Sequence, residues 1–267
     1  MPTVLLRLSG PMQAYGTSSH WEERATRSRP TKSATVGLIA NALGLNLNAP
    51  LNELAQLVFT VRADRPGIQM TDQQSAGGGT FPANAPGLPA PDTSALYGAP
   101  RDPVAARDGS LRTSRKKGSR GAVLIAKHYL ADAAFLAGLS SANEQLLRSI
   151  DHALHRPARL LFLGRRSCPP AYPVAHGTTP YGPDQWPSLV PLLPEATTTR
   201  PTVWTETLPS AGAVPSPEQP PATFAHRMHA TMFLRTSAAQ PPPHHALDTE
   251  CPCRTRALTR SQPGDLP

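Results

Sequence analysis

The stretch from Arg27 to Gly44, RSRPTKSATVGLIANALG, predicts a basic loop that leads into a helix with one apolar face. Pro30 disfavours a helical conformation of the residue before it, so the helix is expected to begin after this proline. The hydroxyl of Thr31 or Ser33 can accept a hydrogen bond from an unpaired N–H group of the first turn, and Gly44 stands where a C-cap glycine belongs. The apolar face has helical i, i+3, i+4, i+7 spacing and consists of Val36, Ile39, Ala40 and Leu43.

The start of this helix is a candidate phosphate site. Free backbone N–H groups and the positive end of the helix dipole favour an anion there, and Arg27, Arg29 and Lys32 add positive charge. The alternative is an ordinary capped helix, because many helices begin near a Lys and bind nothing. A nucleotide P-loop is not indicated, since no glycine occupies the positions that GxxxxGK[ST] requires before Lys32.

The overall charge indicates the class of partner. The chain has 26 Lys and Arg against 18 Asp and Glu, a net charge of +8 that favours a polyanion. Its 3 cysteines cannot form a disulfide framework, and no apolar run approaches the ~20 residues that span a bilayer. We therefore expect a cytoplasmic protein with reduced thiols, no secretory signal and no membrane partner.

The apolar pattern predicts strands and helices in the order of an α+β or α/β unit. The adjacent runs Ala122–Leu130 and Ala133–Leu139 are rich in Ala and Leu, so their composition also permits helices. Ser141 and Glu144 form a capping-box pattern at the start of a helix that ends at Pro157. Further strands are expected at Thr3–Leu8, Leu57–Ala63, Arg159–Leu163, Thr202–Thr207 and Met228–Arg235, with a short hairpin arm at Pro66–Asp72.

Two further segments combine basic residues with a complete lack of acids. Gly109–Ala131 has six basic residues and no Asp or Glu, which makes phosphate contact a better interpretation than a merely solvated loop. The second segment includes the sequence GRRSCPP, and it also contains no acid. The candidate phosphate-binding residues of the two segments are Arg112, Arg115, Lys116, Lys117, Arg165 and Arg166.

The polar loop Met12–Trp21 follows the first predicted strand and its Gly10 turn. Gln13, Tyr15 and Trp21 could hydrogen-bond to bases or stack on them. The alternative is that the two aromatic rings simply cover the core. Both interpretations stay open from the residues alone.

A catalytic site is not indicated by the acids, histidines or cysteines. A metal-dependent nuclease needs converging carboxylates, but the acids are scattered and only Glu22 and Glu23 are adjacent. Neither Cys251-Pro-Cys253 with His244 and His245 nor Cys168 has the pattern of a zinc site or a nucleophile. We therefore predict no catalytic residue, no metal and no cofactor. The remaining alternative is a metal-independent ribonuclease assembled from His20, His128, Tyr129 and Lys127.

Four motifs in order along the chain resemble the CasD family, the type I-E form of the fifth CRISPR-associated protein. They are GPMQAYGT, PTKSATVGLIANALG, HYLADAAF and LGRRSCPP. The resemblance implies an α+β, ferredoxin-like, RRM-related domain of order βαββαβ over residues 1–165, in which Ala122–Leu139 is a hairpin of two strands. It also implies a thumb insertion at about 73–120 and a smaller β-rich part over 166–236. The proline-rich segment 237–267 is expected to be disordered.

The resemblance also implies a function. The protein would be a non-catalytic Cascade subunit that binds the 5′ handle of the CRISPR RNA (crRNA) and caps the complex. Its partners would be the backbone filament subunit and the large PAM-recognising subunit, and it would meet target DNA only through the complex. The alternative is a metal-independent endoribonuclease that processes repeat RNA, as relatives in another CRISPR subtype do. The predicted RNA-binding residues are Gly10, Gln13, Tyr15, Trp21, Arg27, Arg29, Lys32, Ser33, Arg112, Arg115, Lys116, Lys117, Arg165 and Arg166.

Overall fold

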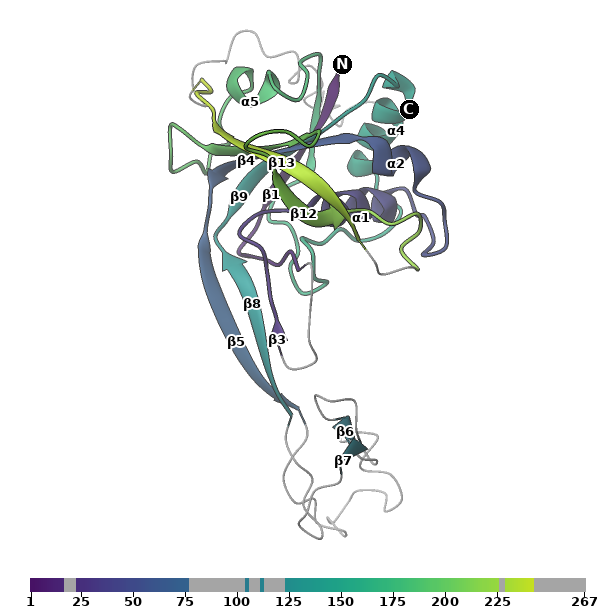
Figure 1. The fold of residues 1–267 in the computed structure, drawn as a ribbon, viewed down its shortest axis with the longest axis vertical. Helices are drawn as coiled ribbons and strands as arrows, with labels where there is room; N and C mark the ends of the chain where they lie inside the picture. The colour runs from purple at the N-terminus through teal and green to yellow at the C-terminus, as the bar shows by residue number, and fades with distance from the viewer. Residues whose placement is uncertain (17–22, 77–103, 106–110, 113–122, 226–228, 243–267) are drawn as a thin grey trace, which may run out of the picture.

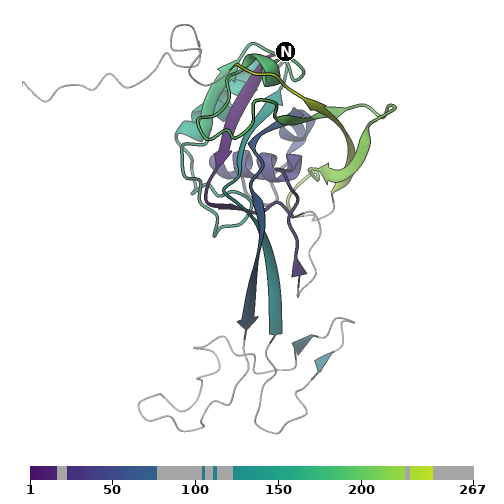
Figure 2. The ribbon, with the colours of Figure 1, turned by 90° about the vertical axis from the view of Figure 1, so that its left-hand side faces the viewer.

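The computed structural model describes residues 1–16, 23–76, 104–105, 111–112, 123–225 and 229–242. It is a mixed α/β structure in which antiparallel sheets dominate. Figure 1 shows a body built on one large sheet, from which strands β5 and β8 project together as a long arm. Figure 2 shows the same arm extending away from the body in a perpendicular view. No described helix has the length and apolar character needed to cross a membrane.

The body is organised around a seven-stranded sheet with the order β10-β1-β9-β4-β11-β13-β12. Each strand pairs antiparallel with its neighbours, including β11 with β4, so the C-terminal strands extend the N-terminal sheet. The predicted boundary between an RNA-binding domain that ends at residue 165 and a C-terminal part that begins at residue 166 stays a prediction. The strands are β1 (Thr3–Ser9), β4 (Val58–Arg65), β9 (Ala134–Ser140), β10 (Ala175–Thr179), β11 (Thr202–Thr207), β12 (Val214–Gln219) and β13 (Ala230–Ala238).

Strand alternation gives this sheet two different buried faces. Phe59 and Val61 of β4 lie in the main core, which includes buried residues of helices α1 (Lys32–Ala42) and α4 (Glu144–His155). Arg62 and Asp64 alternate with them and are also fully buried, so they face the opposite side. There they meet a segment that includes α5 (Trp186–Leu189), whose Trp186 belongs to a second, smaller core cluster. Helix α2 (Asn52–Gln56) precedes β4.

The two long helices begin with side-chain caps. Thr31 accepts a hydrogen bond from the N–H of Ala34 at 3.2 Å, and Gly44 beyond the helix end has a φ of 74°, so the predicted caps of α1 are confirmed. The capping-box prediction at Ser141 is wrong. Asn143 is the N-cap of α4 and accepts from the N–H of Leu146 at 3.1 Å.

The arm is a continuation of two strands of the body. β5 (Ile68–Ala76) pairs with β8 (Val123–Ala131), and β4 pairs with β9. The predicted β8–β9 hairpin is therefore wrong, because the two strands follow one another in line and each pairs with an opposing strand. The two strands are joined at a bend, where Asp132 has a φ of 53°, while Gly67 opposite has a φ of 76°. The predicted short arm at Pro66–Asp72 extends to Ala76.

Smaller strands lie beside the arm. β2 (Met12–Gln13) pairs antiparallel and β3 (Glu23–Arg24) pairs parallel with the edge of β8 that β5 leaves free. β6 (Val104–Ala105) and β7 (Leu111–Arg112) form a separate two-stranded ladder. The rest of the predicted thumb lies outside the described residues.

Two predictions for the second half need correction. Arg159–Leu163 is not a strand, because the N–H of Leu163 is bonded to the carbonyl of Cys168 in a turn, at 2.7 Å. The strand that follows α4 is β10, which pairs with β1.

The predicted strands at Thr202–Thr207 and near Met228–Arg235 are confirmed as β11 and β13. The segment 237–267 does not begin as disorder, since β13 extends to Ala238 and the description continues to residue 242. Residues 243–267 lie outside it.

Candidate nucleic-acid interface

The start of α1 is closed by carboxylates from the C-terminal strands. Arg29 donates two hydrogen bonds to Glu218 of β12, at 2.8 and 2.7 Å. Lys32 donates to Glu206 of β11 at 2.8 Å and to Gln219 at 3.0 Å, and the exposed fraction of Lys32 is 1%. Burial lowers the pKa of the Lys32 ammonium, and the nearby Glu206 carboxylate opposes this shift. The phosphate site predicted at Arg29 and Lys32 is therefore occupied by the protein's own acids.

We predict that Lys32→Met will destabilise the fold and otherwise leave unchanged the RNA affinity that the sequence predicts. Breaking this mostly buried pair leaves Glu206 uncompensated, which should lower the free energy of unfolding by about 2–4 kcal/mol. Urea denaturation measures this change, with Arg148→Met on α4 as a control, because Arg148 forms only an exposed pair with Glu144. If Lys32→Met instead kept native stability but lost salt-dependent RNA affinity, the result would support the phosphate site predicted from the sequence.

The residues after β1 also have structural partners. Gln13 is fully buried, donates to the carbonyls of Leu8 and Ala133 at 3.1 and 2.7 Å, and accepts from the hydroxyl of Tyr15 at 2.7 Å. Burial raises the pKa of Tyr15 well above its ordinary value. Gly10 is buried, and a Cβ there would lie 3.0 Å from the carbonyl oxygen of Pro169. In this arrangement the predicted base contacts of Gln13 and Tyr15 are replaced by contacts within the core.

The structure describes only some of the other residues predicted in these loops. Ser33 is half-buried and Arg27 is exposed, and the N–H of Arg27 donates to the carbonyl of Tyr15 at 2.8 Å. The structure describes only the backbone of Arg112, in β7. The predicted residues that lie outside the described ranges are Trp21, Arg115, Lys116 and Lys117.

Strand pairing gathers three cations on one side of β8. Arg24 of β3 is the register partner of Lys127, so their side chains lie on the same face. Tyr129 lies on this face as well, and the guanidinium of Arg165 is 4.7 Å from the centre of its ring. We call this side of the sheet, with Arg24, Lys127 and Arg165, the cationic face. The face also includes Asp72, the partner of Lys127 on β5.

Arg165 fixes the geometry of the cationic face. Its guanidinium donates to the carbonyl of Arg24 at 2.8 Å and to the carbonyl of His128 at 3.1 Å, so it ties β3 and β8 to the 163–168 turn. The neighbouring Arg166 is exposed. Lys127 donates to Gln74 of β5 at 2.5 Å. Sequence reasoning selected Arg165 and Arg166 as RNA-binding residues. It counted Lys127 among the basic residues of Gly109–Ala131 without selecting it, and it did not consider Arg24.

The 163–168 turn depends on a glycine. Gly164 has a φ of 85°, and a Cβ there would lie 1.7 Å from the carbonyl oxygen of Ala14. The carbonyl of Leu163 accepts from the N–H of Ala14 at 3.1 Å, so the turn is attached to the segment after β2. Cys168 is fully buried, and burial raises the pKa of its thiol. The motif LGRRSC therefore builds a turn that presents two arginines.

The described residues do not assemble the ribonuclease considered from the sequence. His128 contacts Thr71 and Glu23, whereas Lys127 and Tyr129 alternate with it and lie on the opposite face of β8. Tyr129 is buried beneath Arg165. His20 lies outside the described ranges. Within those ranges, no group of three or more His, Cys, Asp or Glu residues could hold a metal ion.

Comparison with known proteins identifies the family. A family model described as CRISPR-associated protein (Cas_Cas5) matches residues 3–233. The chain belongs to this CRISPR-associated family. A curated relative is the CRISPR system Cascade subunit CasD of Escherichia coli (strain K12), which is 29% identical over 180 residues, covering 66% of this chain and 70% of the relative.

Solved structures of CRISPR-associated proteins share the fold of this family member. A crystal structure of a Cas protein superimposes with a TM-score of 0.62 at 26% identity and covers 90% of this chain and 97% of its own. A chain of a CRISPR RNA-guided surveillance complex has a TM-score of 0.62 at 28% identity and covers 91% and 95%.

Proposed function

We propose that this protein is a non-catalytic subunit of a type I-E Cascade complex that binds the 5′ handle of the crRNA in the cytoplasm. The curated relative is a Cascade subunit, and one structural relative comes from an RNA-guided surveillance complex. In this proposal the protein caps the complex and contacts the backbone filament subunit and the large PAM-recognising subunit. Target DNA reaches it only through the assembled complex.

The observation that carries the proposal is the cationic face. Single-stranded RNA is held by cations that follow its phosphates, and Arg24, Lys127 and Arg165 stand together on one strand surface. Arg165 is already oriented by two backbone carbonyls, so less side-chain entropy is lost when a phosphate binds. Exposed Arg27 and Arg166 extend the positive charge on adjoining segments.

The order of elements also supports a ferredoxin-like domain. β1, α1, β4, β9, α4 and β10 follow the chain in the order βαββαβ. The four strands are adjacent in the sheet in the order β10-β1-β9-β4. We propose that this unit is the RRM-related domain implied by the sequence motifs, with β5 and β8 at the base of its insertion.

The test is a titration of a fluorescent handle RNA with the purified protein over a series of salt concentrations. Lys127→Ala/Arg166→Ala should reduce the slope of log K against log salt by about 1.4, because each lost phosphate contact removes ~0.7 for a single strand. Arg148→Ala/Arg156→Ala is a matched control, because both arginines are exposed on or next to α4. An unchanged slope in the Lys127/Arg166 variant would contradict the proposed interface.

The proposed absence of catalysis has a separate test. Repeat RNA is incubated with the purified protein in EDTA, and its ends are mapped on a sequencing gel. Intact RNA is expected, because His128 and Lys127 lie on opposite faces of β8. Cleavage that disappears in His128→Ala would favour the endoribonuclease.

A further inference from the structure

We infer that Glu23 and His128 form a positioning pair that holds β3 in place, so that Arg24 is presented on the cationic face. This inference rests on the proposed RNA-binding function. β3 comprises only Glu23 and Arg24, and it pairs with β8 through the matches Glu23↔Ala126 and Arg24↔Lys127. A ladder of two residues is a weak attachment, so side-chain contacts decide how firmly Arg24 is held.

One imidazole connects three strands on the face opposite the cations. Nδ1 of His128 lies 2.9 Å from the hydroxyl of Thr71 on β5, and its Nε2 lies 3.3 Å from a carboxylate oxygen of Glu23 on β3. On the other face, Arg165 donates to the carbonyl of Arg24. β3 is therefore held from both sides, by a cation on the RNA-binding side and by the imidazole on the far side.

Protonation strengthens the imidazole contact. A protonated His128 donates from both ring nitrogens, so Glu23 accepts a charge-assisted hydrogen bond while Thr71 accepts the second. A neutral ring has one N–H and makes no ion pair with Glu23. Among the described residues, Glu23 from β3 and Thr71 from β5 contact this ring, and Asp72 and Lys127 lie on the opposite face.

The consequence is a pH-dependent affinity for RNA. Acidification that protonates His128 should secure β3 and tighten RNA binding. Glu23 is 65% exposed, so the pair is a surface ion pair. The expected tightening is about two- to fivefold, the range that such a pair supports.

The experiment measures the dissociation constant of handle RNA from pH 5.5 to 8 for the native protein, Glu23→Gln and His128→Gln. We expect the tightening at low pH in the native protein and its loss in both variants. His155→Gln is the matched control and should keep the native profile, because His155 forms a similar contact with Asp151 at 3.9 Å on α4.

Two outcomes would overturn the inference. A native profile that Glu23→Gln retains and His128→Gln loses would show that His128 contacts RNA directly. A native profile without pH dependence would show that the pair does not control β3. Glu23 is a surface residue, so Glu23→Gln gives a valid comparison even if His128→Gln fails to fold. Failure of the proposed function itself would appear differently, as no salt-dependent RNA binding at any pH.

Discussion

Replacing Arg62 by methionine is expected to lower the free energy of unfolding by about 3–5 kcal/mol, the cost of removing one partner of a buried ion pair. Arg62 and Asp64 are both fully buried on the α5 side of the sheet. The guanidinium donates to the two oxygens of Asp64 at 2.6 and 2.9 Å. Methionine fills a similar volume but leaves the Asp64 carboxylate without its countercharge.

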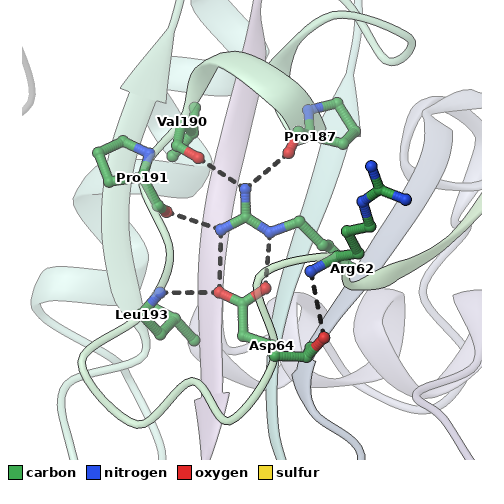
Figure 3. A network of polar contacts seen from close by, with 8 residues as sticks. Arg62, Asp64, Pro187, Val190, Pro191 and Leu193 are labelled. Atoms are coloured by element: carbon green, nitrogen blue, oxygen red, sulfur yellow. Dashed lines mark hydrogen bonds and ion pairs between the residues drawn. The ribbon is translucent and has the colours of Figure 1, made fainter. Parts of the chain in front are cut away.

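Figure 3 shows that this pair also fastens the segment covering the sheet. The remaining guanidinium hydrogens are donated to the carbonyls of Pro187, Val190 and Pro191 at 2.8, 2.6 and 2.6 Å. Asp64 accepts in addition from the N–H of Leu193 at 2.8 Å. Loss of Arg62 thus leaves three carbonyls of the covering segment unpaired, each of which adds to the cost.

Chemical denaturation of matched variants measures this effect. Arg235→Met is the control, because Arg235 pairs with Asp184 at 2.6 Å but both side chains are more than half exposed, so a loss below about 1 kcal/mol is expected. Arg62→Met/Asp64→Leu should recover part of the loss, since it removes both charges. Equal losses for Arg62→Met and Arg235→Met would refute the structural role of the buried pair.

Replacing Gly164 by alanine is expected to destabilise the protein by more than ~2 kcal/mol and to abolish most of the RNA affinity that we propose for the cationic face. A Cβ at this position would lie 1.7 Å from a backbone oxygen of Ala14, so the turn must move. The positive φ of 85° adds a cost of about 1–2 kcal/mol for a residue with a Cβ. Displacing the turn takes Arg165 away from the carbonyls of Arg24 and His128.

The control separates the two causes. Gly212 has nearly the same φ, 84°, but a Cβ there has no atom within 4 Å. Gly212→Ala should therefore show the backbone cost alone and leave RNA binding unchanged. The two variants are compared by thermal unfolding and by RNA titration. Similar behaviour of both would mean that the contact with Ala14 relaxes at little cost, contrary to the expectation.

Local sequence signals predicted the elements that depend on neighbouring residues. The cap at Thr31, the terminal Gly44 and the strands β1, β4 and β11 are all confirmed. Errors arose where distant residues decide the structure. The hairpin at Ala122–Leu139 was expected from the family resemblance, but β8 and β9 pair with β5 and β4, whose residues lie 47 to 82 positions earlier in the chain.

The candidate site divides in the same way. Arg165 and Arg166 were predicted from a short basic motif. In the structure Arg166 is exposed, and Arg165 contacts the backbone of the exposed Arg24. Arg29 and Lys32 look equally basic in the sequence. Their partners Glu218 and Glu206 are 189 and 174 residues away, so no local pattern could show that these charges are neutralised. A basic residue near a helix start is ambiguous until its acids are located.

The way the arm joins the body has a consequence for loop-closure entropy. The ladder of β5 and β8 ends with the pair Ala76 and Val123, so the chain between these residues begins and ends at adjacent positions. The entropic cost of closing a loop grows slowly with its length, by only ~0.6 kcal/mol for each doubling. The pairs that hold the sheet of the body, between β4 and β9, end at Arg65 and Ala134 and do not include this segment. Changes in chain length between Ala76 and Val123 are therefore expected to have little effect on the stability of the sheet.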